Sequence, residues 1–231
     1  MRIAVVPAAA LLLAGCAGAP QSAPARLTPI TGSAGAPAPA PESASPSAPA
    51  TTSSAVAAPG PGASADTAIA WVESAAPVDA ADFGVALRGG VSTALGQDVA
   101  FTTGSGISCM TDVKRAAAGL ACLVDLTDPP PPPAGVYGVW KGGWVDFDGT
   151  AVEVGSAHGD PGRFAAGQGP PLPPDRSLSF GDFRCRADDQ ILVCVNYANR
   201  TAVRYSDSGV DAPGCTRDRG PTPGIGIRYT C

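Results

Sequence analysis

Apolar and polar side chains alternate most clearly in residues 144–154, on both sides of the dipeptide Asp148-Gly149. A period of two is typical of a strand with one buried face, and Asp-Gly favours the positive φ angles of a two-residue hairpin turn. Pairing Phe147 with Thr150 across this turn separates an apolar face from a polar one. The two faces are Val145, Phe147, Val152 and Val154 on one side, and Trp144, Asp146 and Glu153 on the other.

Short apolar runs bounded by turn-forming residues predict further strands at 99–101, 107–110, 120–126, 182–186, 191–197 and 201–205. One helix is expected over 79–87, where apolar side chains follow helical spacing behind Asp79 as an N-cap. The proline run 129–133 and the Gly/Pro-rich stretch 155–174 are expected as surface loops. The fold class predicted is mainly β: a small antiparallel sandwich or partly open barrel, with at most one or two short helices.

Composition divides the chain into three parts. Residues 17–66 consist largely of Ala, Pro, Ser and Gly, with no aromatic residue, so they cannot bury enough apolar surface to offset chain entropy. We therefore expect a signal peptide at 1–15, a lipidated cysteine with a disordered linker at 16–66, and a single β-rich exported domain at 67–231.

The N-terminus carries the pattern of an export signal. Arg2 precedes an apolar run that is too short to span a membrane as a mature helix. The sequence Leu13-Ala14-Gly15-Cys16 resembles the lipobox of bacterial lipoproteins. The resemblance implies cleavage before Cys16, a diacylglycerol on its thiol and an acylated amino terminus, which together anchor a protein stably. We expect the outer face of the plasma membrane; the alternative is an ordinary secretory signal with a chance cysteine.

Six cysteines follow the linker, and an even number in an exported chain predicts a disulfide framework. Two pairs flank short polar segments, where a symmetric hairpin would place the sulfur atoms within bridging distance. Zinc binding is the alternative, but the chain has no CxxC pair, so no metal or other cofactor is expected. The favoured pairs are Cys109–Cys122, Cys185–Cys194 and Cys215–Cys231.

Charge and candidate catalytic residues restrict the function. A net charge of −5 argues against a surface that binds nucleic acid. Ser156, His158 and Asp160 are the residue types of a hydrolytic triad, but three neighbours on one loop do not easily adopt its geometry. We interpret them as a turn-rich surface loop. The aspartate pairs at 146/148 and 188/189 are interpreted as turn formers rather than calcium ligands.

Two tryptophans, Trp140 and Trp144, stand four residues apart across a Gly-Gly pair. They could form an aromatic platform for a sugar or lipid, or Trp144 could pack under the 155–174 loop, which is the interpretation we favour. Trp140, Trp144 and His158 are thus the candidate ligand contacts.

Several cysteine-containing segments together resemble a group of uncharacterised lipoproteins and secreted proteins of mycobacteria and related actinobacteria. The likeness covers most of residues 97–231. It implies export, disulfides and a β-rich domain, and it transfers no catalytic residue. The segments are Phe101–Cys109, Trp140–Trp144, Ser179–Cys185, Cys194–Tyr197 and Pro223–Cys231.

These observations predict a lipid-anchored cell-envelope lipoprotein with a non-enzymatic binding or structural domain. Its partners would be the membrane, through the anchor, and an envelope ligand or protein. The alternative is a cell-surface hydrolase or carbohydrate-active enzyme that uses His158 with a nearby carboxylate.

Overall fold

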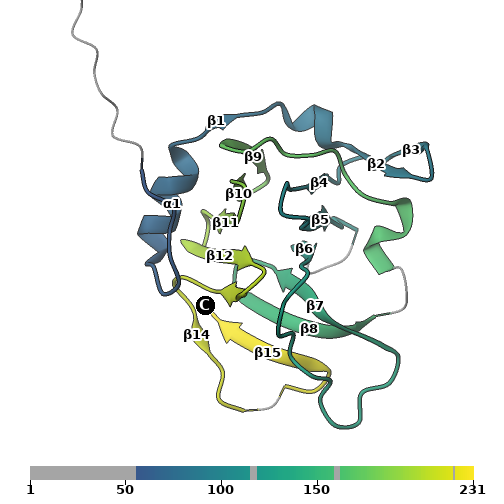
Figure 1. Ribbon diagram of the computed structural model, residues 1–231, viewed down its shortest axis with the longest axis vertical. Helices are drawn as coiled ribbons and strands as arrows, with labels where there is room; N and C mark the ends of the chain where they lie inside the picture. The colour runs from purple at the N-terminus through teal and green to yellow at the C-terminus, as the bar shows by residue number, and fades with distance from the viewer. Residues whose placement is uncertain (1–55, 115–118, 159–161, 221) are drawn as a thin grey trace, which may run out of the picture. The chain divides into compact units, whose positions relative to one another are not determined.

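The structure, a computed structural model, describes residues 56–114, 119–158, 162–220 and 222–231. The predicted signal peptide, Cys16 and most of the predicted linker lie outside these residues. Within them, the strands form two large sheets and one small hairpin, as Figure 1 shows. The prediction of a mainly β, disulfide-containing fold is confirmed, and neither large sheet closes into a barrel.

The sheets are antiparallel throughout, except for the first pair of the six-stranded one. In spatial order, the six-stranded sheet contains β1 (Ala76–Pro77), β9 (Arg176–Phe180), β10 (Phe183–Ala187), β11 (Leu192–Asn196), β12 (Thr201–Ser206) and β13 (Gly209–Asp211). The seven-stranded sheet contains β14 (Thr216–Arg217), β15 (Ile225–Thr230), β8 (Ala151–His158), β7 (Val139–Phe147), β6 (Leu120–Leu123), β5 (Ser108–Thr111) and β4 (Ala100–Thr102).

One apolar cluster joins the inner faces of the two sheets, which makes the fold a β sandwich. The seven-stranded sheet contributes Phe101, Phe147 and Val152, and the six-stranded sheet contributes Leu178 and Tyr205, all of them fully buried. Alternation along each strand sends the intervening side chains outward, so each sheet has a second face that needs its own cover.

Helical segments and a loop provide these covers. The α-helix α1 (Ala65–Glu73) packs Ile69 and Val72 against Val193 and Val195 on the outer face of the six-stranded sheet. On the other sheet, the 3-10 helix η2 (Gly162–Ala166) packs onto the outer face through Phe164. Burying these apolar side chains contributes roughly 1.5–3 kcal/mol for each large residue.

The sequence analysis missed α1 and placed a helix further along the chain. Ser64 caps α1 by accepting from the backbone N–H of Thr67, so the ordered chain begins before residue 67. Pro59 is also buried, and its carbonyl accepts from Arg204 Nε at 3.0 Å. Residues 56–66 are therefore packed onto the domain rather than part of the linker.

The predicted helix over 79–87 is only partly right. Asp79 does cap a helical turn, accepting from the N–H of Ala81 at 2.9 Å, but the 3-10 helix η1 (Ala80–Phe83) ends at once. The chain then forms the hairpin of β2 (Val85–Arg88) and β3 (Val91–Ala94). The backbone of Leu87 exchanges two hydrogen bonds with the backbone of Gln168, which lies just after η2. The local spacing of apolar residues could not predict this contact, because the two segments are far apart along the chain.

In the β7–β8 hairpin the predicted faces are confirmed, but the predicted register is shifted by two residues. Phe147 pairs with Val152 and Asp146 with Glu153. Asp148 causes the longer turn, because its Oδ1 accepts from the N–H groups of Thr150 and Ala151 at 2.7 and 2.8 Å. A shift of two residues preserves which side chains point inward, since the side-chain period of a strand is two.

All three disulfides have the pairing that the sequence favours; two join residues that face each other on neighbouring antiparallel strands, and the third joins residues that flank such a pair. The cysteines of the bonds Cys109–Cys122 and Cys185–Cys194 are fully buried in the core between the sheets. The bonds are Cys109–Cys122 in β5–β6, Cys185–Cys194 in β10–β11, and Cys215–Cys231 beside β14–β15.

In the described part of the chain, no helix is long and apolar enough to cross a membrane.

Candidate functional site

The two tryptophans do not form an open platform, because Trp144 is fully buried. Its indole N–H donates to Asp146 Oδ2 at 2.8 Å, and its ring meets Phe164 of η2 edge-on, with the centroids 5.4 Å apart. A Cβ on Gly162 would lie 3.2 Å from the Trp144 ring. Trp144 therefore packs under η2, which lies within the stretch predicted as the 155–174 loop, and is not a ligand contact.

Trp140 has a different environment on the same strand. Its indole N–H donates to the carbonyl oxygen of Pro130 at 3.0 Å, and a Cβ on Gly155 would lie 2.7 Å from its ring. The side chain is half-buried between β8 and the proline run. Trp140 thus holds the proline segment in place rather than offering an open face to a ligand.

The interpretation of Ser156, His158 and Asp160 as a turn-rich surface loop is wrong for the first two, because β8 extends as far as His158. The backbone of His158 ends β8, opposite Val139, and Ser156 lies two residues earlier in the same strand, opposite Lys141. Asp160 and the His158 side chain lie outside what the structure describes. His158 therefore stays a candidate contact from the sequence alone, and so does the hydrolase alternative.

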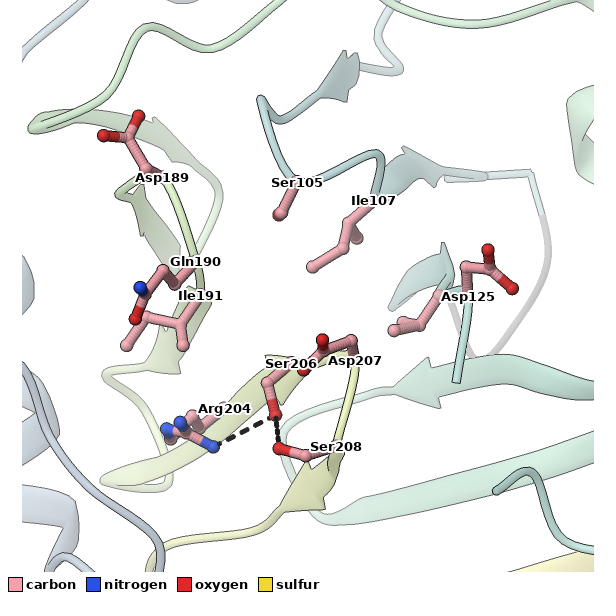
Figure 2. A pocket seen from close by; sticks show the side chains of 11 residues that line it. Ser105, Ile107, Asp125, Asp189, Gln190, Ile191, Arg204, Ser206, Asp207 and Ser208 are labelled. Carbon is pink, nitrogen blue, oxygen red and sulfur yellow. Dashed lines mark hydrogen bonds between the residues drawn. The ribbon is translucent and has the colours of Figure 1, made fainter. Parts of the chain in front are cut away.

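A cleft with a volume of about 510 Å³ lies elsewhere, at one end of the sandwich. Segments from both sheets line it: the residues just before β5 and just after β6 form one wall, and the end of β12 with the turns after β10 and β12 forms the other. Figure 2 shows these side chains around the open space. Three lining residues are buried and apolar: Ile107, Val124 and Ile191. The exposed rim is polar: Ser105, Asp125, Asp189, Gln190, Asp207 and Ser208.

Local hydrogen bonds fix the turns that form the rim. Thr103 Oγ1 bonds to Ser105 Oγ at 2.8 Å and accepts from the N–H of Ile107 at 3.2 Å. Across the cleft, Asp188 Oδ1 accepts from the N–H groups of Gln190 and Ile191, both at 2.8 Å. Each turn is thus held by its own side chain, which presents the rim residues in a defined geometry.

The third turn follows β12 and is fixed by a chain of polar contacts. Ser206 Oγ bonds to Ser208 Oγ at 3.0 Å and donates to the carbonyl of Gly209 at 3.0 Å. Arg204 Nη1 donates to Ser206 Oγ at 3.3 Å and pairs with Asp211 at 3.1 Å, as Figure 2 shows for the Arg204–Ser206 bond. The Arg204 charge is therefore already balanced by Asp211.

The cleft is acidic because its rim carries exposed carboxylates, whereas Asp211 balances the charge of Arg204. The carboxylates of Asp125, Asp189 and Asp207 stand exposed at its rim, whereas the one cation in the lining is paired. None of the lining residues is a histidine, cysteine or lysine, and the Ser206 hydroxyl bonds only to serine, arginine and backbone groups. The arrangement can donate and accept hydrogen bonds and attract positive charge, but it holds no nucleophile activated by a base.

Sequence reasoning missed this cleft because its walls come from four turns that are distant along the chain. Of the aspartates interpreted as turn formers, Asp148 and Asp188 do serve in that way, but the interpretation is wrong for Asp146, which lies within β7. Asp146 bonds to Trp144 and pairs with Arg163 at 3.4 Å on the outer face of β7. Among the described residues, no group of three or more His, Cys, Asp or Glu side chains could hold a metal ion.

In comparisons with protein-family models, with curated proteins and with solved structures, no significant match to this chain was found.

Proposed function

We propose that this protein is an exported lipoprotein of the cell envelope, anchored by lipid at Cys16, whose β sandwich is a non-enzymatic binding domain. The resemblance of its N-terminus to a lipobox and of its domain to actinobacterial exported proteins supports this proposal. The linker would set the distance between the outer face of the plasma membrane and the domain.

The disulfides support export. Six cysteines form three bonds, which is common in oxidising compartments and rare in a reducing cytosol. Each bond closes a loop of 9 to 16 residues along the chain, and a bond of this kind stabilises by about 2–4 kcal/mol. The fold is thus suited to the space outside the membrane.

The cleft at the end of the sandwich is the observation that carries the binding function. Hydrogen bonds fix three of the turns that carry its rim before any ligand arrives, which lowers the entropic cost of binding. Its apolar floor and acidic rim suit an envelope component that has hydroxyl groups and a neutral or positive charge, such as an amino-sugar polymer. An anionic ligand would be repelled.

Fractionation tests the anchor. The full chain, expressed in an actinobacterial host, should partition with membranes and take up an alkynyl fatty-acid label. Cys16→Ala should abolish the labelling and release the protein, whereas Thr51→Ala, a control in the linker, should change neither. Labelling that persists in Cys16→Ala would refute lipidation at this residue.

Co-sedimentation tests the cleft. The full chain in detergent should bind insoluble cell-wall polysaccharide, and Asp125→Asn with Asp189→Asn should weaken binding about tenfold, the loss of one charge-assisted hydrogen bond. Asp82→Asn, an exposed carboxylate outside the cleft, is the matched control. If both variants bind equally well, the cleft is not the binding site. This outcome would leave the result for the lipid anchor unchanged.

A further inference from the structure

Glycines form a shallow track across the outer face of the seven-stranded sheet. Gly226 of β15 lies opposite Gly155 of β8, between the pairs Ile225–Ser156 and Ile227–Val154. Gly142 continues the track on β7, where the register shifts. Because none of these positions has a side chain, another segment can lie directly on the backbone.

The proline run occupies this track. A Cβ on Gly142 would lie 2.7 Å from Pro129 Cβ, and one on Gly226 would lie 2.8 Å from Pro130 Cβ. Trp140 also holds Pro130 on the track, because its indole N–H donates to the Pro130 carbonyl oxygen. Figure 1 shows the run within the long connection between β6 and β7, which passes the start of β15. The half-buried Pro130 and one side of the otherwise exposed Pro129 thus attach the run to the domain.

The next part of the run faces solvent. Pro131 and Pro132 are exposed, and Tyr137, five residues further on, is 92% exposed, the highest value among the exposed large hydrophobic residues described. Within the described chain, the carbonyl oxygens of Pro131 and Pro132 accept no hydrogen bond. The domain therefore displays two adjacent proline rings with two free acceptors, and one exposed tyrosine five residues further along the chain.

Consecutive prolines adopt the extended polyproline II helix, since each ring fixes φ near −65° and none has an N–H to donate. A partner that binds such a helix meets little entropic cost, because the helix is already formed. Domains that do so use aromatic grooves, which pack against proline rings and donate hydrogen bonds to the carbonyls. Pro131 and Pro132 offer such a groove two exposed rings and two carbonyl oxygens that accept no hydrogen bond within the described chain.

We propose that the segment from Pro129 to Tyr137 is a docking ligand for a partner protein with an aromatic, polyproline-binding groove. Pro129 and Pro130 anchor it on the glycine track, and Pro131, Pro132 and Tyr137 contact the partner. This surface is distinct from the acidic cleft and does not depend on the function proposed for it.

The test is a binding assay of the full chain in detergent against immobilised SH3, WW and EVH1 domains and profilin as polyproline-binding probes. At least one probe should retain the protein. Pro131→Ser with Pro132→Ser should weaken that binding about tenfold or more, with the thermal unfolding midpoint unchanged because both side chains are exposed. A benzophenone side chain introduced at position 137 should cross-link to the bound probe.

Pro173→Ser with Pro174→Ser is the matched control, since these two prolines are also adjacent and exposed but lie outside the segment. Failure of every probe to bind would overturn the proposal, as would an equal loss in the control. A dimer in analytical ultracentrifugation that only the Pro131/Pro132 variant disrupts would also overturn it, because the surface would then serve self-association.

Discussion

The guanidinium carbon of Arg186 lies 4.1 Å from the centre of the Trp71 ring, and Arg186 Nη1 donates to the Trp71 carbonyl oxygen at 2.7 Å. The same nitrogen donates to Ser74 Oγ at 2.8 Å, and Nη2 pairs with Asp175 at 2.6 Å. Trp71 belongs to α1 and Arg186 to β10, so one side chain joins the end of the helix to the sheet. The domain depends on this contact to keep the outer face of β11 covered.

Arg186→Ala should therefore lower the free energy of unfolding by about 2–3 kcal/mol, through the loss of charge-assisted hydrogen bonds and of the contact with the Trp71 ring. Arg186→Lys should recover less than half of this, because an ammonium group cannot make the same fork of bonds. Urea denaturation, followed by tryptophan fluorescence, measures both. Arg200→Ala is the control: its ion pair with Asp66 is mostly exposed, so the loss should stay below about 1 kcal/mol. Equal losses at the two arginines would contradict this account.

The three disulfides should differ in their resistance to reduction. Cys109–Cys122 and Cys185–Cys194 are fully buried, whereas Cys231 is exposed. Mild dithiothreitol should reduce the bond to Cys231 first, with the rest of the domain still folded, because a thiolate must reach a sulfur atom to attack it. Alkylation and mass spectrometry under native conditions give the order. Earlier reduction of either buried bond would show that the core opens more readily than its burial indicates.

Tyr205 is fully buried between the sheets, and its hydroxyl has no hydrogen-bond partner among the described residues. Burial, aided by the nearby Asp146 charge, raises the pKa of this phenol far above its ordinary value. Tyr205→Phe should leave the free energy of unfolding unchanged or raise it by up to about 1 kcal/mol, since it removes an unpaired buried group. Tyr205→Leu, which leaves a cavity instead, should lower it by about 2–4 kcal/mol. Thermal and urea unfolding test the pair, and a marked loss in Tyr205→Phe would reveal a partner for the hydroxyl.

Glu153 should make stability depend on pH. Burial raises the pKa of this carboxyl in the folded protein, although the Arg228 guanidinium, 2.9 Å away, acts in the opposite direction. The folded state therefore holds the proton more tightly than the unfolded chain, a contribution that is full below the unfolded pKa and is lost as the pH rises through the folded pKa. Relative to the native protein, Glu153→Gln should gain stability between pH 3 and pH 7, measured by urea unfolding at several pH values. Glu73→Gln, at the exposed end of α1, is the control; parallel pH curves for native protein and Glu153→Gln would refute the effect.

The glycine track should tolerate no side chain. A Cβ at Gly226 would lie 2.8 Å from both Pro130 and the Val154 carbonyl, so Gly226→Ala should displace the proline run and cost about 1–3 kcal/mol. Trp140 fluorescence should shift to the red as the ring loses its cover. Gly104→Ala is the control, because a Cβ there meets no atom within 4 Å. Unchanged fluorescence in Gly226→Ala would mean that the run is not seated on the track.

Local pattern predicted much of this domain. The inward and outward faces of the β7–β8 hairpin follow from alternation alone and survive the shift in register, because a shift of two residues returns every side chain to the same face. The pairing of Cys109 with Cys122 and of Cys185 with Cys194 follows from short hairpin loops. A turn formed by Asp148 or Asp188 needs only its own neighbours.

Features that join distant segments could not be predicted in this way. The helix α1 lies in an alanine-rich stretch like that of the linker, and its apolar face is stable only because Val193 and Val195 cover it. The cleft assembles four polar turns, each of which resembles ordinary surface in the sequence. The burial of Trp144 depends on its contact with Phe164, twenty residues away along the chain.

The sequence by itself determined the mainly β character and the cysteine pairs, because each depends on residues that are close along the chain. Only the tertiary structure decided which surfaces are free: it buried Trp144, committed Trp140 to the proline run and opened the acidic cleft. Exposure is a property of the packed whole, since a side chain is covered or left free by segments that its own neighbourhood does not specify.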